Sequence, residues 1–188
     1  VILPFEKEYF KNNWDWEVEY VGHPLVEEIV RSQESGVWSR QFSDRPIVAL
    51  LPGSRKQEIL KKLPVMLEVS RTFQGHQFIV AKAPGVAENF YDNILKPYSN
   101  VSYVSNQTYD LLMQSKAALV TSGTATLETA LFGVPEVVCY KGSWLSYQIG
   151  KRLVNVKYIS LVNLIMDKPV VKELIQNDLT VDNLKKEL

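Results

Sequence analysis

Short apolar runs, each followed directly by a turn and a helical pattern, recur along this chain and restrict its fold more than any other feature. The clearest run is Ile47–Leu51, which leads into Pro-Gly-Ser-Arg and a helical pattern over residues 56–73. Similar runs, apolar except for Ser102, occupy residues 78–81, 101–104, 117–120 and 137–140. Alternating strands and helices are typical of α/β proteins, and wholly apolar strands are typical of parallel sheets covered on both faces. The sequence therefore predicts a Rossmann-like α/β fold, an open and mainly parallel sheet with helices on both faces.

The turn after the fourth run carries residues that suit a nucleotide. Gly123 allows close backbone approach and Thr124 is a good helix N-cap, so the free N–H groups at the start of the next helix form an anion site. Glu128 lies about one turn further on, where its carboxylate can accept hydrogen bonds from ribose hydroxyls. Taken alone, this stretch is more simply interpreted as an ordinary strand-to-helix turn with a surface glutamate.

A second candidate anion site follows the first apolar run. Gly53 and Ser54 can offer backbone amides, and the planar guanidinium of Arg55 matches a phosphate. The alternative is a surface ion pair between Arg55 and Glu58. Both turns follow strands of one predicted parallel sheet, as do residues 105–108 and 141–143, so all four can converge at the edge where such sheets bind ligands. Two turns of this kind together favour a diphosphate or nucleotide site.

Other classes of site lack their signatures in this sequence. There is no Walker loop, no Gly-x-Gly-x-x-Gly fingerprint and no Gly-x-Ser-x-Gly elbow. No cluster of His, Cys, Asp and Glu has metal-ligand spacing, so we expect a metal-independent site without a cofactor. The 21 basic and 21 acidic residues cancel, which argues against a nucleic-acid partner. The single cysteine, Cys139, lies in an apolar run and is predicted to be a buried structural thiol.

Several further predictions concern individual segments. Residues 17–21 alternate as a strand, and residues 144–154 and 171–176 have helical patterns. His23 is interpreted as a hinge or helix-capping residue. The chain opens on a strand-like stretch without a methionine, and residues 180–188 read as an unfinished helix. We therefore expect one nucleotide-sugar-binding domain over residues 1–188, a fragment that lacks an N-terminal acceptor domain and the extreme C-terminus.

Together these motifs resemble the C-terminal half of the lipid-A-disaccharide synthases, membrane-associated glycosyltransferases of the two-domain GT-B fold. Pro-Gly-Ser-Arg and Ser-Gly-Thr-Ala-Thr-Leu-Glu are specific as a pair, and Val162 departs from the expected proline, which loosens the loop that presents Asn163. The matching pieces follow the family's order: Leu-Pro-Phe-Glu at 3–6, Gly-His-Pro at 22–24, Leu-Leu-Pro-Gly-Ser-Arg-Lys-Gln-Glu at 50–58, Ser-Gly-Thr-Ala-Thr-Leu-Glu at 122–128, Val-Val-Cys-Tyr-Lys at 137–141, Ser-Leu-Val-Asn-Leu at 160–164 and Val-Lys-Glu-Leu-Ile-Gln at 171–176.

The resemblance implies a reaction in lipid A biosynthesis. UDP-2,3-diacylglucosamine would donate its sugar, with inversion, to 2,3-diacylglucosamine 1-phosphate, giving lipid A disaccharide 1-phosphate and UDP. The resemblance also implies a cytoplasmic protein, peripheral on the inner face of the inner membrane. Its partners would be the two substrates, the membrane surface and the absent N-terminal half, which is expected to supply the general base. A homodimer is a further candidate partner, and the isolated chain is not expected to turn over.

The resemblance assigns this chain the donor site. Arg55 and Asn163 would be catalytic, with Arg55 holding the donor diphosphate and Asn163 lying near the donor. The remaining donor contacts would come from Gly53, Ser54, Gln107, Gly123, Thr124, Ala125 and Glu128. Among these, Thr124 and Ala125 offer amides, Glu128 takes the ribose, and the loop at 105–108, which includes Gln107, reads the base.

Two alternatives remain at this stage. One is another GT-B enzyme that acts on UDP-sugars, such as a non-hydrolysing 2-epimerase. Such an enzyme should carry acidic and histidine residues aimed at the sugar, and this sequence shows no cluster of them. The other is a non-catalytic nucleotide-binding domain.

Overall fold

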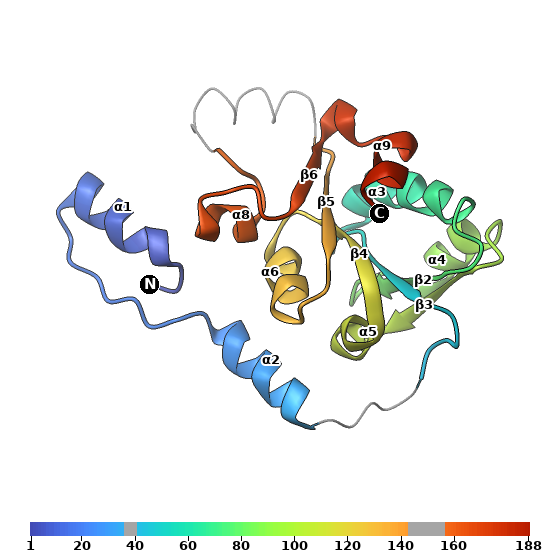
Figure 1. Cartoon of the computed structure of the whole chain (residues 1–188), viewed down its shortest axis with the longest axis horizontal. Coiled ribbons are helices and arrows are strands. Elements are labelled where there is room, and N and C mark those ends of the chain that lie inside the picture. The colour runs from blue at the N-terminus through green and yellow to red at the C-terminus, as the bar shows by residue number, and fades with distance from the viewer. Residues whose placement is uncertain (36–40, 143–156) are drawn as a thin grey trace.

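The computed structural model describes residues 1–35, 41–142 and 157–188, and a parallel six-stranded sheet lies at its centre (Figure 1). The strand order is β3-β2-β1-β4-β5-β6, and every neighbouring pair is parallel. The predicted open parallel sheet is therefore confirmed, in the strand order of Rossmann folds. The strands are β1 (Ile47–Leu51), β2 (Gln77–Lys82), β3 (Val101–Ser105), β4 (Ser115–Thr121), β5 (Glu136–Tyr140) and β6 (Lys172–Ile175).

Helices alternate with these strands as the sequence predicts. The five apolar runs became β1 to β5, and the final helical pattern became the short helix α9 (Val181–Glu187). The described helices are α1 (Pro4–Trp14), α2 (Pro24–Ser35), α3 (Lys56–Ser70), α4 (Glu88–Leu95), α5 (Thr108–Gln114), α6 (Thr124–Leu131), α8 (Leu161–Met166) and α9 (Val181–Glu187), with a 3-10 turn η1 (Gln176–Asp178).

Each face of the sheet has its own apolar core. On one face Leu63 of α3, Tyr91 of α4 and Leu184 of α9 are fully buried against β1, β2 and β5. On the other face Leu111 and Leu112 of α5 are fully buried, with partly buried side chains of α6 beside them. Because burying one such side chain contributes roughly 1.5–3 kcal/mol, the two cores fix the helices on opposite faces.

The centre of the sheet is a topological switch point. From β1 the chain runs outward to β2 and β3, and it then returns through α5 to β4 on the other side of β1. Leu51 at the end of β1 pairs with Val120 near the end of β4. The turns that follow these two strands therefore lie next to each other, and ligands of open α/β sheets bind at such a point.

Three of the segment predictions are wrong. Residues 171–176 do not form a helix, because β6 occupies Lys172–Ile175 and pairs with β5 from Val137↔Lys172 to Tyr140↔Ile175. Residues 17–21 are not a strand, and neither are the opening residues 1–3. Hydrogen bonds join these two segments: the amide of Val21 donates to the carbonyl of Val1, and the terminal ammonium of Val1 donates to the carbonyl of Glu19. The predicted helix over 144–154 lies outside the described residues.

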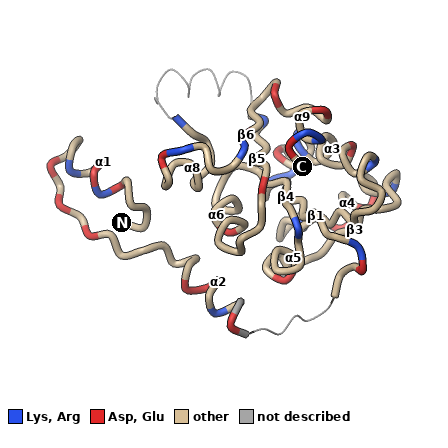
Figure 2. Tube along the Cα trace, in the orientation of Figure 1, with Lys and Arg blue, Asp and Glu red and all other residues tan. Residues whose placement is uncertain are grey.

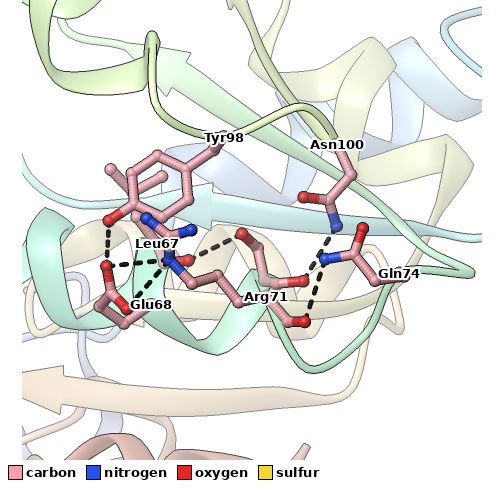
Figure 3. A network of polar contacts seen from close by, with 7 residues as sticks. Leu67, Glu68, Arg71, Gln74, Tyr98 and Asn100 are labelled. Carbon is pink, nitrogen blue, oxygen red and sulfur yellow. Dashed lines mark hydrogen bonds and ion pairs between the residues drawn. The ribbon is translucent and has the colours of Figure 1, made fainter.

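A polar network closes the end of α3 that is remote from the switch point (Figure 3). The amide nitrogen of Asn100, which is buried, donates to the carbonyl of Ser70 at 3.0 Å and lies 3.4 and 3.3 Å from the carbonyls of Phe73 and His76. The Tyr98 hydroxyl donates to Glu68 at 2.5 Å. Because the last carbonyls of a helix lack intrahelical partners, this network satisfies the end of α3 and fixes its return to β2.

The N-terminal segment lies apart from the sheet (Figure 1). Helix α1 contributes no buried residue, and Tyr9, Trp14 and Trp16 are each more than half exposed. Helix α2, by contrast, contacts α5 and α6 and buries Ile29. The chain is therefore anchored to the sheet from α2 onward, whereas residues 1–21 form an aromatic arm that we define by that range.

Candidate functional site

Two glycine turns meet at the switch point. Gly53 follows β1 with a φ of 119°, and Gly123 follows β4 with a φ of 144°, so both adopt backbone conformations that side chains disfavour. At Gly53 an added Cβ would lie 2.8 Å from Oε2 of Glu58, whereas at Gly123 it would meet nothing within 4 Å. The first turn is therefore closely packed against α3, and the second leaves open space beside its backbone.

The start of α6 differs from the prediction in one respect. The N-cap residue is Gly123 rather than Thr124, which is the first residue of the helix, and no side chain caps this end. Gly123 and Thr124 are exposed, and Ala125 is partly buried. The first amides of α6 therefore have no side-chain acceptor and begin at an open turn, which suits an anion.

Arg55 stands at the start of α3, where it is the N-cap residue. Its Nη1 lies 3.2 Å from Oε1 of Glu58, so the ion pair that the sequence offered as an alternative is present. The side chain of Arg55 is 81% exposed, and an exposed pair contributes only about 0–1 kcal/mol. The guanidinium can therefore leave Glu58 for a phosphate at small cost, and the pair does not decide between the two interpretations.

Lys62 is a charged residue at this point that the sequence reasoning missed. It lies on α3, is 4% exposed, and donates a hydrogen bond to the hydroxyl of Thr121, the last residue of β4. Burial lowers the pKa of its ammonium group, and the carboxylate of Glu58 opposes that shift. The sequence did indicate that Lys62 is buried, because Ile59, Lys62 and Met66 follow one another at intervals of three and four residues and so lie on one face of α3.

Glu128 lies one turn into α6 and is partly buried. Burial raises the pKa of its carboxyl, and the nearby His23 opposes that rise. Burial also raises the pKa of Tyr109 on α5, and the charge of Glu128 adds to that effect. The starts of α2, α5 and α6 therefore come together around Glu128. His23 itself accepts a hydrogen bond on Nδ1 from the amide of Leu25 at 3.2 Å, as a helix-capping residue does.

Gln107 lies on the loop after β3, further from the centre of the sheet. It is the N-cap residue of α5, and with Asn106, Thr108, Tyr109 and Asp110 it lines a cavity of about 300 Å³. Helix α5 carries this loop toward α6, where the rings of Tyr109 and Phe132 are 5.2 Å apart. The start of α5 therefore packs against the residue that ends α6.

Asn163 is placed close to the second turn, but its side chain is fully occupied. Its Oδ1 accepts from the amide of Val171 at 2.9 Å, and its Nδ2 donates to the carbonyl of Val171 and to Glu173, both at 2.9 Å. It is 1% exposed. Glu173 also accepts from Ser160, and the neighbouring carbonyl of Ile159 accepts from the Ser122 hydroxyl at 2.8 Å. In this structure Asn163 therefore supports the turn from behind.

Charges of both signs are distributed along the chain. Figure 2 shows basic and acidic residues interspersed along the described trace, and the formal net charge is zero. An anion would therefore be attracted by local groups at the switch point and not by the overall field of the molecule. Among the described residues, no three His, Cys, Asp or Glu side chains gather as metal ligands, and no helix is long and apolar enough to span a bilayer.

Known proteins resemble this chain over its whole length. The family model for lipid-A-disaccharide synthetase matches residues 1–188. A lipid-A-disaccharide synthase of Syntrophus aciditrophicus is 40% identical over all of this chain and 51% of its own length. One of Francisella tularensis is 36% identical over all of this chain and 52% of its own length. The chain thus spans about half the length of these curated relatives.

A solved structure shows the same fold. The ADP-heptose LPS heptosyltransferase II of E. coli aligns with 92% of this chain and 52% of its own, with a TM-score of 0.52 and 13% identity. At that identity the likeness concerns the fold alone, and the α/β architecture expected from the GT-B resemblance is confirmed.

Proposed function

The chain belongs to the lipid-A-disaccharide synthase family, and we propose that it forms the donor-binding half of an inverting hexosyltransferase. The whole protein transfers 2,3-diacylglucosamine from UDP to the 6-hydroxyl of 2,3-diacylglucosamine 1-phosphate. The products are lipid A disaccharide 1-phosphate and UDP. The observation that carries the proposal for this half is the meeting of two glycine turns, each opening a helix, after the adjacent strands β1 and β4.

The chemistry of the proposed reaction is a single displacement. The acceptor oxygen forms a bond to the anomeric carbon while the bond from that carbon to UDP breaks, which inverts an α-linked donor into a β-linked product. The hydroxyl proton passes to a base that we assign to the half of the protein outside this chain. The electron pair of the broken bond stays on the leaving diphosphate oxygen, which gains a negative charge, and fixed dipoles and cations at that oxygen lower the barrier.

Residues at the switch point divide that task. The amides of Thr124 and Ala125 begin α6 without a side-chain cap, so they can donate to phosphate oxygens. Arg55 can exchange Glu58 for the departing diphosphate, and Gly53 and Ser54 form the turn from which it extends. Gly123 lets the ligand approach the backbone. The site needs no divalent ion in this proposal.

The remaining predicted residues take the nucleoside side of the donor. Glu128 accepts from the ribose hydroxyls, and Gln107 belongs to the loop that reads the base. Both polar atoms of the Asn163 side chain are hydrogen-bonded, which supports a positioning role for this residue. Its side chain links α8 to β6 behind Ser122. We also propose that the whole protein acts at the inner face of the inner membrane, where its acylated substrates reside, and that a homodimer is one of its assemblies.

Substituting Arg55 tests the donor site. In the full-length protein Arg55→Ala should weaken UDP binding at least about tenfold, since each tenfold corresponds to roughly 1.4 kcal/mol and a charge-assisted hydrogen bond contributes about 1.5–3 kcal/mol. The measurement is a calorimetric titration with UDP, with ADP and NAD as competitors for specificity.

Arg71→Ala is the matched control. Arg71 pairs with Glu68 at the opposite end of α3, in the same i,i+3 arrangement as Arg55 and Glu58. Its loss should leave UDP affinity unchanged. Preference of the wild-type protein for ADP or NAD over UDP would contradict the proposed donor, and equal UDP affinity in both variants would assign Arg55 to the ion pair alone.

A further inference from the structure

We propose that Lys62 is a second cation of the donor site, and that its buried ammonium group binds the diphosphate from beneath the two glycine turns. The inference rests on the proposed function and adds to it a residue from the interior of the fold. It assigns to α3 two separate contributions, Arg55 at the exposed rim and Lys62 at the floor.

The position of the ammonium group carries the first part of the argument. Lys62 extends from α3 to the end of β4, where Nζ donates to the Thr121 hydroxyl. The same Nζ lies 3.6 Å from the point that a Cβ on Gly53 would occupy. It therefore lies between the ends of β1 and β4, directly under the turn that each strand leads into.

The hydrogen bonding of this group is incomplete. An ammonium has three N–H donors, and within the described ranges Lys62 makes one hydrogen bond, to Thr121. No ion pair joins it to an Asp or Glu of those residues. Glu58 is the nearest source of negative charge, but its Oε1 already pairs with Arg55. A buried cation without a paired anion is unfavourable unless a ligand supplies the charge.

The neighbouring thiol does not supply that charge. Cys139 of β5 is fully buried, and burial raises its pKa to about 12, so it stays neutral and cannot act as a thiolate partner. The groups around Lys62 are thus the Thr121 hydroxyl, the neutral Cys139 thiol and the Glu58 carboxylate. Lys61, on the same helix, adds electrostatic repulsion. Among these groups only the carboxylate of Glu58 carries negative charge; its Oε2 lies beside the first turn, and its Oε1 pairs with Arg55.

A diphosphate fits the donors that converge there. The uncapped amides at the start of α6 and the guanidinium of Arg55 reach the open side of the turns, and Lys62 reaches them from the core. A compact ammonium acts as a point charge and suits a phosphate oxygen of any orientation, whereas a guanidinium prefers two oxygens in one plane. The ligand class is therefore a diphosphate, free or as part of a nucleotide.

The test compares two adjacent lysines in the full-length protein. Lys62→Met removes the buried charge with little change in shape, and Lys61→Met removes an exposed charge one residue earlier on α3. Calorimetric titrations use UDP, uridine and inorganic pyrophosphate. Lys62→Met should lose at least about tenfold in affinity for UDP and pyrophosphate and keep its affinity for uridine, while Lys61→Met should match the wild type with all three.

Thermal unfolding distinguishes a binding role of Lys62 from a structural one, because the two roles predict opposite changes in the melting temperature of Lys62→Met. Without ligand, Lys62→Met should melt at or above the wild-type temperature, because the variant lacks an unpaired buried cation. It should also lose the rise in melting temperature that pyrophosphate gives the wild type. A variant that melts well below wild type would assign Lys62 to the fold, and Lys62→Gln, which can still donate to Thr121, should then restore the melting temperature.

Each outcome of the titrations decides a separate question. Equal UDP affinity in Lys62→Met and wild type overturns the inference and leaves the donor site intact. If the wild type prefers ADP to UDP but Lys62→Met loses pyrophosphate binding, the inferred role of Lys62 is supported and the proposed UDP donor is wrong. If the wild type binds neither UDP nor pyrophosphate, both are overturned.

Discussion

At the scale of single residues, Glu136 shows how burial makes stability depend on pH. It is 8% exposed at the start of β5, and neither carboxylate oxygen has a hydrogen-bond partner in the described part of the chain. Burial raises its pKa from 4.5 to about 8. Between these values the unfolded chain loses the proton while the folded chain keeps it, so the free energy of unfolding should fall as the pH rises.

We expect Glu136→Gln to remove that dependence. Each pKa unit corresponds to about 1.4 kcal/mol, so the wild type should lose up to about 4–5 kcal/mol between pH 4.5 and pH 8, and the glutamine variant should lose much less. Urea denaturation at pH 5 and pH 8.5 measures the difference. Glu8→Gln, on exposed α1, is the control and should keep the wild-type slope. Parallel pH profiles for Glu136→Gln and wild type would mean that a partner stabilises the carboxylate.

Single residues of the candidate site differ in how far the sequence could place them. The glycine turns could be predicted, because a glycine directly after an apolar strand and before a helix has few other uses. Lys62 could be predicted from its place on the buried face of α3, although not its contact with Thr121, which joins residues far apart in sequence. The hydrogen bonds of the Asn163 side chain could not be predicted, because both of its partners, Val171 and Glu173, lie in a segment that was predicted to be a helix.

At the scale of elements, the end of α3 depends on one buried amide. Asn100 reaches from the start of β3 to the carbonyls that follow the last turn of α3 (Figure 3). Asn100→Ala should lower the free energy of unfolding by about 1–3 kcal/mol, because it leaves a buried carbonyl without its donor. Chemical denaturation with urea gives the value.

Gln74→Ala offers a control in the same network. Its side chain donates to the carbonyl of Arg71 at 3.0 Å, but Gln74 is exposed, so water can replace that bond. Its loss should change stability by less than about 0.5 kcal/mol. Equal effects of the two substitutions would show that the network, and not the buried amide, sets the stability of this end of α3.

The elements that the sequence misassigned share a cause. β6 has four residues at the edge of the sheet, and its burial pattern (one exposed, one buried and two partly buried residues) is too short to distinguish from one helical turn. β6 is a strand because it pairs with β5, and its local sequence pattern carries no information about that pairing. Residues 17–21 alternate like a strand but find no sheet to join. The apolar runs that form β1, β2, β4 and β5 were assigned correctly, because a buried parallel strand needs little information beyond its own residues.

At the scale of the whole molecule, the aromatic arm at residues 1–21 contributes little to the stability of the sheet. Helix α1 buries none of its residues, and the anchoring contacts begin with α2. We therefore expect deletion of residues 1–21 from this chain to change the melting temperature by no more than about 2 °C, within the usual effect of an exposed surface change.

Circular dichroism during heating of the two chains measures this difference. Deletion of residues 1–35 is the matched control, because it also removes Ile29 and the packing of α2 on α5 and α6, and it should lower the melting temperature clearly. A large loss in the shorter deletion would assign the arm a role in the fold that its exposed aromatic side chains do not indicate.

The pairing of β1 with β4 has a consequence for the order in which this chain becomes functional. Gly53 and Gly123 are about 70 residues apart, and they become neighbours only when that long loop closes. A ligand that touches both turns binds the closed chain and not the open one, so it acts as a reversible cross-link across the centre of the sheet. At a concentration of 100 times its Kd, such a ligand adds about 2.7 kcal/mol to folding. Under the proposed function that ligand is a nucleotide sugar, and resistance to proteolysis in the cell would then follow its supply.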